Sequence, residues 1–242
     1  MSKPKHPLAL SLVTLGLVVA TGLTCATCGM LPIADPGEPG FALGSVERLE
    51  DGSLDRGRLL EARDLEDVTG HTWPATGWVH YHEGRLDSFD LDRDHLPPGW
   101  SPGRELPAGT RVALEEDGSV RFVFLPADAT LDGVPVNGGG KVMTGFHADG
   151  ALRYAFLSHD TELDGIPCEA SLFHSAHLHP NGRLARARLS RDFEYAGSSF
   201  TKGDEIRLDE EGQVVVARVE RGGGALGMVM LSYEVLNSDG SV

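Results

Sequence analysis

Histidines are the first residues of this chain whose type and spacing could do chemistry. His82, His147 and His179 stand just before a turn glycine, and His80 and His177 lie two positions upstream of His82 and His179. Residues i and i+2 of a strand share a face, so His147, His177 and His179 of two neighbouring segments could converge. Three imidazoles suffice for zinc, and imidazole also suits copper or nickel.

A simpler interpretation is that this turn-side position is polar and faces solvent. Its other members are acidic: Glu50, Glu115 and Asp209. We favour this interpretation, so we assign no residue as a metal ligand. A metal-binding protein that uses the clustered histidines stays the alternative.

Aspartates recur ten residues after the turn glycines, at Asp94, Asp128, Asp160 and Asp192. Paired carboxylates can hydrolyse glycosides, and an acidic ladder can supply the oxygens that Ca²⁺ needs. A residue that recurs in each copy is more typical of a turn former whose side chain accepts hydrogen bonds from nearby backbone N–H groups. We therefore assign no catalytic residue.

One cysteine and four aromatic residues complete the candidates. Cys168 shares its position with apolar residues in other copies, which predicts a buried core thiol. Equivalent positions hold Val136, Phe200 and Met230. Aromatic side chains near the N-terminal end could form a platform for a protein or glycan partner, or thicken a capping unit. They are Trp73, Trp78, Tyr81 and Trp100.

An internal repeat must position all these residues. Gly preceded by Asp, Asn or Glu recurs at intervals of 30 to 34 residues, at Gly52, Gly84, Gly118, Gly150, Gly182 and Gly212. The second and seventh residues after each glycine are aliphatic. Such a period marks a repeat architecture.

Local patterns translate the repeat into strands. Residues 111–115 alternate between polar and apolar, which predicts a strand with one buried face. The Asp-Gly or Asn-Gly that follows such a run suits a tight hairpin, because glycine accepts a positive φ. Residues 131–136 form a third apolar stretch, kinked by Gly133. The sequence predicts an all-β fold of six imperfect β-hairpin repeats of about 32 residues, as an extended meander or a β-solenoid.

Two copies carry a resemblance to a known family. Residues 146–152 (FHADGAL) and 178–184 (LHPNGRL) resemble MORN-variant repeats, whose hairpins follow an aromatic-x-x-Asn-Gly-x-Leu pattern. The period here, about 32 residues, is longer than that family's. The resemblance implies an elongated antiparallel β array used for contacts, and it implies no catalytic residue.

The N-terminus has the order of an export signal. Lys3 and Lys5 precede an uncharged run over residues 8–23, and small residues follow. This order predicts a signal peptide over 1–26, cleaved after Ala26. The alternatives are an uncleaved anchor or lipid attachment at Cys25 or Cys28. Residues 27–44 are predicted to be a linker, and residues 45–242 the β-repeat domain.

The composition of the chain limits which classes of function are plausible. The chain has 36 acidic and 21 basic residues and a net charge of −15, which argues against binding nucleic acid. Three cysteines cannot form a disulfide scaffold. We expect an exported, non-enzymatic interaction or structural protein of the cell envelope, periplasmic, extracellular or anchored, without a cofactor. Its protein or glycan partner would bind the Trp-rich first two repeats, and a membrane would be met only through an N-terminal anchor. A secreted enzyme is a further alternative.

Overall fold

A computed structural model describes residues 33–195, 197–223 and 229–235, and its regular structure in these ranges is entirely β. The chain divides into two units, residues 1–31 and 32–242. The predicted signal peptide, with Cys25 and Cys28, lies outside the described residues. Within the described part of the chain, no helix is long and apolar enough to cross a membrane.

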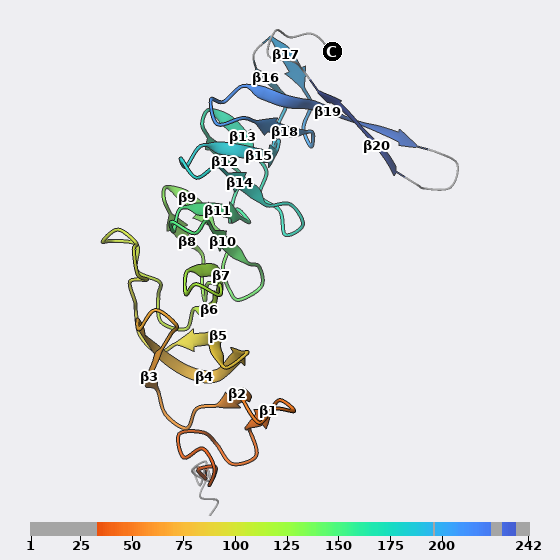
Figure 1. Cartoon of the computed structure of the whole chain (residues 1–242). Coiled ribbons are helices and arrows are strands. Elements are labelled where there is room, and N and C mark those ends of the chain that lie inside the picture. Colours follow the sequence, from red (N-terminus) through yellow and green to blue (C-terminus); the bar gives the residue numbers. More distant parts are fainter. Residues whose placement is uncertain (1–32, 196, 224–228, 236–242) are drawn as a thin grey trace, which may run out of the picture. The chain divides into compact units, whose positions relative to one another are not determined.

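Most strands belong to one antiparallel sheet, the main sheet, which confirms the all-β prediction (Figure 1). Strands that follow one another in this sheet are neighbours in it, as in a meander, and β3 pairs only with β4. Its strands are β1 (Glu47–Arg48), β2 (Leu54–Arg58), β3 (Arg63–Glu66), β4 (Thr72–His82), β5 (Arg85–Leu91), β6 (Arg111–Leu114), β7 (Val120–Phe124), β10 (Thr144–Phe146), β11 (Leu152–Ala155), β14 (Ala176–Leu178), β15 (Leu184–Arg188), β18 (Glu205–Leu208), β19 (Val214–Gly223) and β20 (Val229–Val235).

Turn chemistry explains the hairpins of the main sheet. Between β6 and β7, the Glu115 N–H donates to the Ser119 carbonyl (2.8 Å) and the Gly118 N–H donates to the Glu115 carbonyl (3.0 Å). Gly118 has φ +83°. This is a three-residue loop whose left-handed glycine makes a bulge. The same bonds recur at Gly150, between β10 and β11, and at Gly182, between β14 and β15.

Three further hairpins, the side hairpins, stand outside the main sheet. They are β8 (Ala129–Leu131) with β9 (Val134–Val136), β12 (Thr161–Leu163) with β13 (Ile166–Cys168), and β16 (Phe193–Tyr195) with β17 (Ser198–Phe200). The prediction of one kinked stretch over 131–136 is therefore wrong. Asp132 and Gly133 both have positive φ, +51° and +80°, and form a two-residue turn, which Asp-Gly favours.

Each of the first two side hairpins is tied to the next hairpin of the main sheet. Val136 forms a β-bridge with Leu157, and Cys168 forms one with Leu189. Residues 33–44, part of the predicted linker, make the same kind of contact, because Phe41 forms a bridge with Leu59. The Phe41 side chain is buried there. Structure at this end therefore begins before residue 45.

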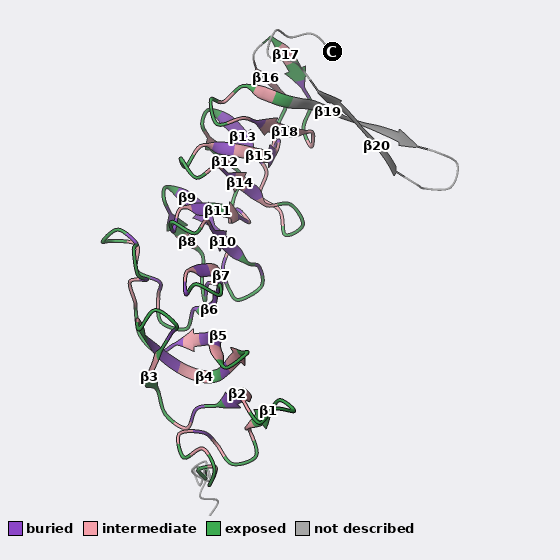
Figure 2. Ribbon diagram, viewed as in Figure 1, coloured by how far each residue is buried: buried purple, intermediate pink, exposed green. Residues whose placement is uncertain are grey.

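The core lies along one face of the main sheet. The two aliphatic positions after each turn glycine are buried in the central hairpins, for example Leu152 and Leu157 at 2% exposure each. Buried positions recur along these strands, whereas exposed ones gather at turns (Figure 2). Each such side chain gains about 1.5–3 kcal/mol on burial, which chain entropy largely offsets.

The connection between β5 and β6, residues 92–110, replaces a side hairpin with a longer, packed segment. The Trp100 ring lies against Phe146 (centroids 4.5 Å apart) and over Gly150. Arg104 donates to the Gly150 carbonyl and to Asp132, at 2.8 Å each. This connection therefore holds two later turns.

Candidate functional site

The face of the main sheet opposite the core carries a continuous row of residues paired across neighbouring strands. We call it the outer row. Most of its larger side chains are half-exposed. In order from β2 to β18, its members are Arg56, His80, Ser88, Ala113, Phe122, Gly145, Tyr154, His177, Arg186 and Arg207.

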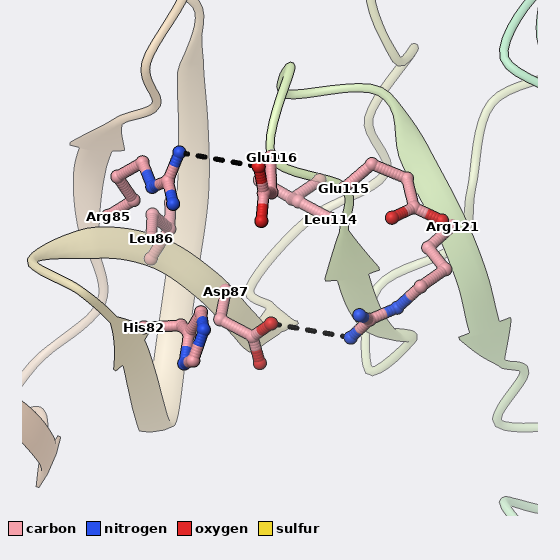
Figure 3. Close-up of a pocket in the computed structure, with 8 residues that line it drawn as sticks. All are labelled: His82, Arg85, Leu86, Asp87, Leu114, Glu115, Glu116 and Arg121. Carbon is pink, nitrogen blue, oxygen red and sulfur yellow. Dashed lines mark hydrogen bonds and ion pairs between the residues drawn. The ribbon is translucent and has the colours of Figure 1, made fainter.

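A polar cleft of about 170 Å³ lies beside the first part of this row, between the β4–β5 and β6–β7 hairpins (Figure 3). Arg85 lies 3.8 Å from Glu116, and Arg121 lies 3.3 Å from Asp87. His82 lines the same cleft. These ion pairs bridge the two hairpins, and the cleft is smaller than the ~300 Å³ of typical ligand pockets. Its charges therefore serve mainly to join the hairpins.

The later part of the row, from Gly145 to Arg207, has different electrostatics. Arg186 Nη2 lies 2.6 Å from His177 Nε2, and Ser175 Oγ lies 3.0 Å from the same nitrogen. Burial, followed by the charges of Arg186 and Arg153, lowers the pKa of His177 to about 4. Because a guanidinium can only donate, His177 Nε2 is the acceptor, and the neutral ring carries its proton on Nδ1.

Tyr154 stands beside His177 on the neighbouring strand. Their ring centroids are 5.7 Å apart. On its other side, the Tyr154 ring fills the space above Gly145, where a Cβ would lie 2.1 Å from Tyr154 Cε1. Glycine at this position lets the ring cross the neighbouring strand. The result is an aromatic surface next to a neutral imidazole and a guanidinium.

His147, His177 and His179 do not converge. His147 Nε2 donates to the Leu178 carbonyl (3.1 Å), and His179 Nε2 donates to the Leu208 carbonyl (3.0 Å). Each ring thus bonds the next hairpin, because the turn-side position points along the sheet rather than toward His177. In the described ranges, no group of three or more His, Cys, Asp or Glu residues could hold a metal ion.

The recurring aspartates close the segments that connect the hairpins. Asp128, Asp160 and Asp192 each accept a hydrogen bond of 2.7–2.8 Å from the backbone N–H ten residues later, at Gly138, Ala170 and Lys202. Asp94 accepts one from the Ala108 N–H at 2.8 Å. The prediction of turn formers is confirmed. Each carboxylate spans the base of a side hairpin or of the 92–110 connection.

Cys168 is fully buried, as predicted. Its Sγ–H donates to the Ile166 carbonyl at 3.3 Å. Burial raises the pKa of this thiol to about 12. The thiol is therefore kept protonated, which makes it a poor nucleophile.

The predicted aromatic platform is only partly exposed. Trp73 and Trp100 are buried, at 0% and 7% exposure, and belong to the core. Trp78 is 37% exposed, with the Arg56 guanidinium 5.7 Å from its ring. The platform expected from four aromatic residues is thus reduced to Trp78 and the half-buried Tyr81, because packing of the 92–110 connection and of β4 takes the other two.

Sequence reasoning missed two features that occur only once. Asp67 is buried and accepts hydrogen bonds from Trp73 Nε1 and Thr69, both at 2.8 Å or less. Burial acts to raise the pKa of Asp67, but these bonds outweigh it and lower the pKa. His71 Nε2 lies 2.9 Å from His95 Nε2. A search for residues that recur at equivalent positions after the turn glycines cannot find the Asp67 and His71–His95 contacts, because neither contact recurs with the repeat period.

A third missed feature is an exposed apolar tip. Phe173 is 87% exposed and Leu172 is 53% exposed, on the connection between β13 and β14. The next residue, His174, lies 2.7 Å from Arg188, on the same strand as Arg186. The tip is therefore linked to the later part of the main sheet.

No protein-family model matches this chain and no curated protein is significantly similar to it, so the resemblance to MORN-variant repeats stays a prediction.

Proposed function

We propose that this protein is an exported, non-enzymatic interaction or structural protein of the cell envelope, built of six imperfect repeats of about 32 residues. The observation that carries the proposal is the outer row. It runs through consecutive hairpins and keeps aromatic and basic side chains half-exposed on the face opposite the core. A sheet face left open over many hairpins offers a partner an extended contact surface.

Exposed aromatic residues supply the anchors that such a surface needs. Trp78 stands beside the first part of the outer row. Phe173 precedes His174, which bonds Arg188 on the strand that holds Arg186. Large aromatic side chains dominate binding energy at interfaces. An aromatic side chain as exposed as Phe173 contributes little to folding, so contact with a partner gives it a use.

The chemistry-bearing side chains favour a scaffold over an enzyme. The carboxylates of Asp128, Asp160 and Asp192 are bonded to backbone N–H groups. The Cys168 thiol is buried and protonated. These residues therefore hold the fold and leave contact as the main use of the surface.

Cosedimentation with isolated bacterial cell envelopes tests the contact surface. We expect residues 32–242 to sediment with the envelopes, and the double variant Trp78→Ser, Phe173→Ser to lose about tenfold or more in affinity, since each anchor is worth more than about 1 kcal/mol. Val68→Ser, which removes an apolar residue of 48% exposure elsewhere, is the matched control and should bind normally. Equal binding by all three chains, or none, would contradict the proposed surface.

Export is tested separately with the full chain. Expressed in a bacterial host, it should fractionate with the envelope or medium, and the chain lacking residues 2–26 should stay in the cytoplasm. Equal distribution of the two would refute an export signal. Elemental analysis of the purified chain, without an affinity tag, tests the alternative function, because about one metal per chain would favour a metal-binding protein.

A further inference from the structure

The later part of the outer row holds more positive charge than its carboxylates neutralise. Among the described residues, ion pairs join Arg188 to Glu169 and Arg207 to Glu205. In the described ranges, no ion pair joins a carboxylate to Arg186 of the row, or to Arg153, which precedes Tyr154 on β11 and acts on His177 through its charge. This local excess stands out in a chain whose net charge is −15.

The charges stand next to groups that suit neutral polar partners. The lowered pKa of His177, about 4, keeps its imidazole neutral near pH 7, and its Nδ1–H is a single donor. The Tyr154 hydroxyl can donate and accept, and its ring offers an apolar face. Tyr154, His177 and Arg186 are paired successively across β11, β14 and β15. With neighbouring strands about 4.8 Å apart, the three rungs span roughly 10 Å.

We propose that Arg153, Tyr154, His177 and Arg186 form a binding subsite for an acidic glycan, with the guanidinium groups taking a sugar carboxylate and Tyr154 packing against the sugar ring. This inference rests on the proposed function, because it names the class of partner for the same outer row. A guanidinium fork matches a carboxylate in a bidentate manner. The Nδ1–H of His177 and the Tyr154 hydroxyl are left for the sugar hydroxyls.

An acidic peptide fits this surface less well. A ligand made mainly of carboxylates would be served best by additional cations, yet the central group here is an uncharged imidazole between an aromatic ring and an arginine. Long-range repulsion from the acidic chain also works against any polyanion. Recognition must therefore draw on the ring and hydroxyl contacts that a saccharide provides.

Calorimetric titration of the purified chain with three probes tests the subsite. The probes are a tetragalacturonate, a neutral maltotetraose and a tetraglutamate peptide. We expect the tetragalacturonate to bind at least about tenfold more tightly than the other two. Arg186→Gln should weaken it by about tenfold or more, as expected for losing a hydrogen bond to a charged group. Arg186→Lys, which keeps the charge without the fork, should restore only part of the affinity.

A matched control is Arg191→Gln, which removes an exposed arginine paired with Glu162 and should bind like the parent. NMR titration of His177 gives a second readout, because a bound carboxylate favours the charged imidazole and should raise its pKa from about 4. Thermal melting checks that the variants are folded. Equal affinity for tetragalacturonate and tetraglutamate, equal affinity of the parent and Arg186→Gln, or no binding to any probe would overturn the proposal.

The envelope cosedimentation assay, run with the same variants, separates this inference from the proposed function. If the parent and Arg186→Gln sediment equally with envelopes and tetragalacturonate does not bind, the glycan subsite is wrong and the contact surface stands. If neither chain sediments and no probe binds, both proposals fail.

Discussion

The side hairpins and the outer row use polar residues in opposite ways. At the base of each side hairpin, an aspartate finds the same kind of partner, a backbone N–H ten residues later. In the outer row, His177 contacts both Tyr154 and Arg186, and the equivalent rungs of other hairpins hold different residues. A polar residue that recurs with an identical partner serves the scaffold. A polar cluster present in one place only is a better candidate for recognition.

The largest effect is expected at the base of a side hairpin. Gly138 lies so close to the connection between β7 and β8 that a Cβ would stand 2.0 Å from the Ala127 carbonyl oxygen. Gly138→Ala should lower the free energy of unfolding by about 3 kcal/mol, because backbone must move. Gly139→Ala, at φ +75° with no atom within 4 Å of the added Cβ, should cost only about 1 kcal/mol. Urea denaturation of both variants measures the difference, and equal losses would mean that the close approach is not a constraint.

A smaller effect is expected when the scaffold carboxylate is removed. Asp160→Ala leaves the Ala170 N–H without its partner and should lower the free energy of unfolding by about 1–2 kcal/mol. Asp149→Ala removes a local hydrogen bond, from the Ala151 N–H two residues later. It should lower the free energy of unfolding by about 0.5 kcal/mol. Chemical denaturation at neutral pH compares the two. A larger loss of stability for Asp149→Ala would contradict the idea that the aspartate at the base of a side hairpin matters more than one within a turn.

The outer row should make stability depend on pH. The pKa of His177 in the folded chain, about 4, lies below its ordinary value of 6.5, so the unfolded chain binds this proton more readily. Stability should therefore fall as the pH drops from about 6.5 to about 4, with no further loss from this group below that. Solvent screening of the half-exposed ring reduces the loss to about 1 kcal/mol.

Melting curves of the parent and of His177→Gln across this range isolate the effect. The difference in stability between the two chains should change between pH 6.5 and pH 4 and be constant below it. A difference that stays constant across the whole range would contradict a neutral His177. The groups that set this behaviour are Arg153 and Tyr154 on β11, Arg186 on β15, and Glu205 with Arg207 on β18.

The smallest effect on stability is expected from the recognition residues themselves. Arg186→Gln should change the free energy of unfolding by less than about 0.5 kcal/mol, as is usual for surface substitutions. The same variant should raise the pKa of His177, because it removes a positive charge that lowers it. NMR titration measures this directly. A large loss of stability with an unchanged pKa would place Arg186 in the scaffold.

Most of the scaffold could be predicted from recurring residues. The turn glycines, the two aliphatic positions after them, the turn-forming aspartates and the buried Cys168 each show their role through equivalents in other copies. The side hairpin formed by β8 and β9, residues 129–136, was missed because the same Asp-Gly pair makes a three-residue loop in one context and a two-residue loop in another. Strand pairing on either side decides which one forms.

The site was harder to predict than the scaffold. Trp73 and Trp100 were candidates for a surface platform, yet both are buried, Trp73 against Phe89 and Trp100 against Phe146. His147 and His179 occupy the same position before a turn glycine, and each bonds a carbonyl of the next hairpin. His177 differs because Arg186 and Tyr154 flank it on neighbouring strands. A contact that occurs in one repeat only has no equivalent residues in the other repeats with which it can be compared.

The sequence by itself determined the β class, the recurrence of the turn glycines, the apolar face and the positions that need glycine. Those properties depend on local backbone preference and on the alternation of side chains along a strand, which act within a few residues. Only the tertiary structure decided which aromatics stay exposed and that Tyr154, His177 and Arg186 form one row. Such neighbours are set by strand register, and a shift of one residue would turn every side chain to the other face.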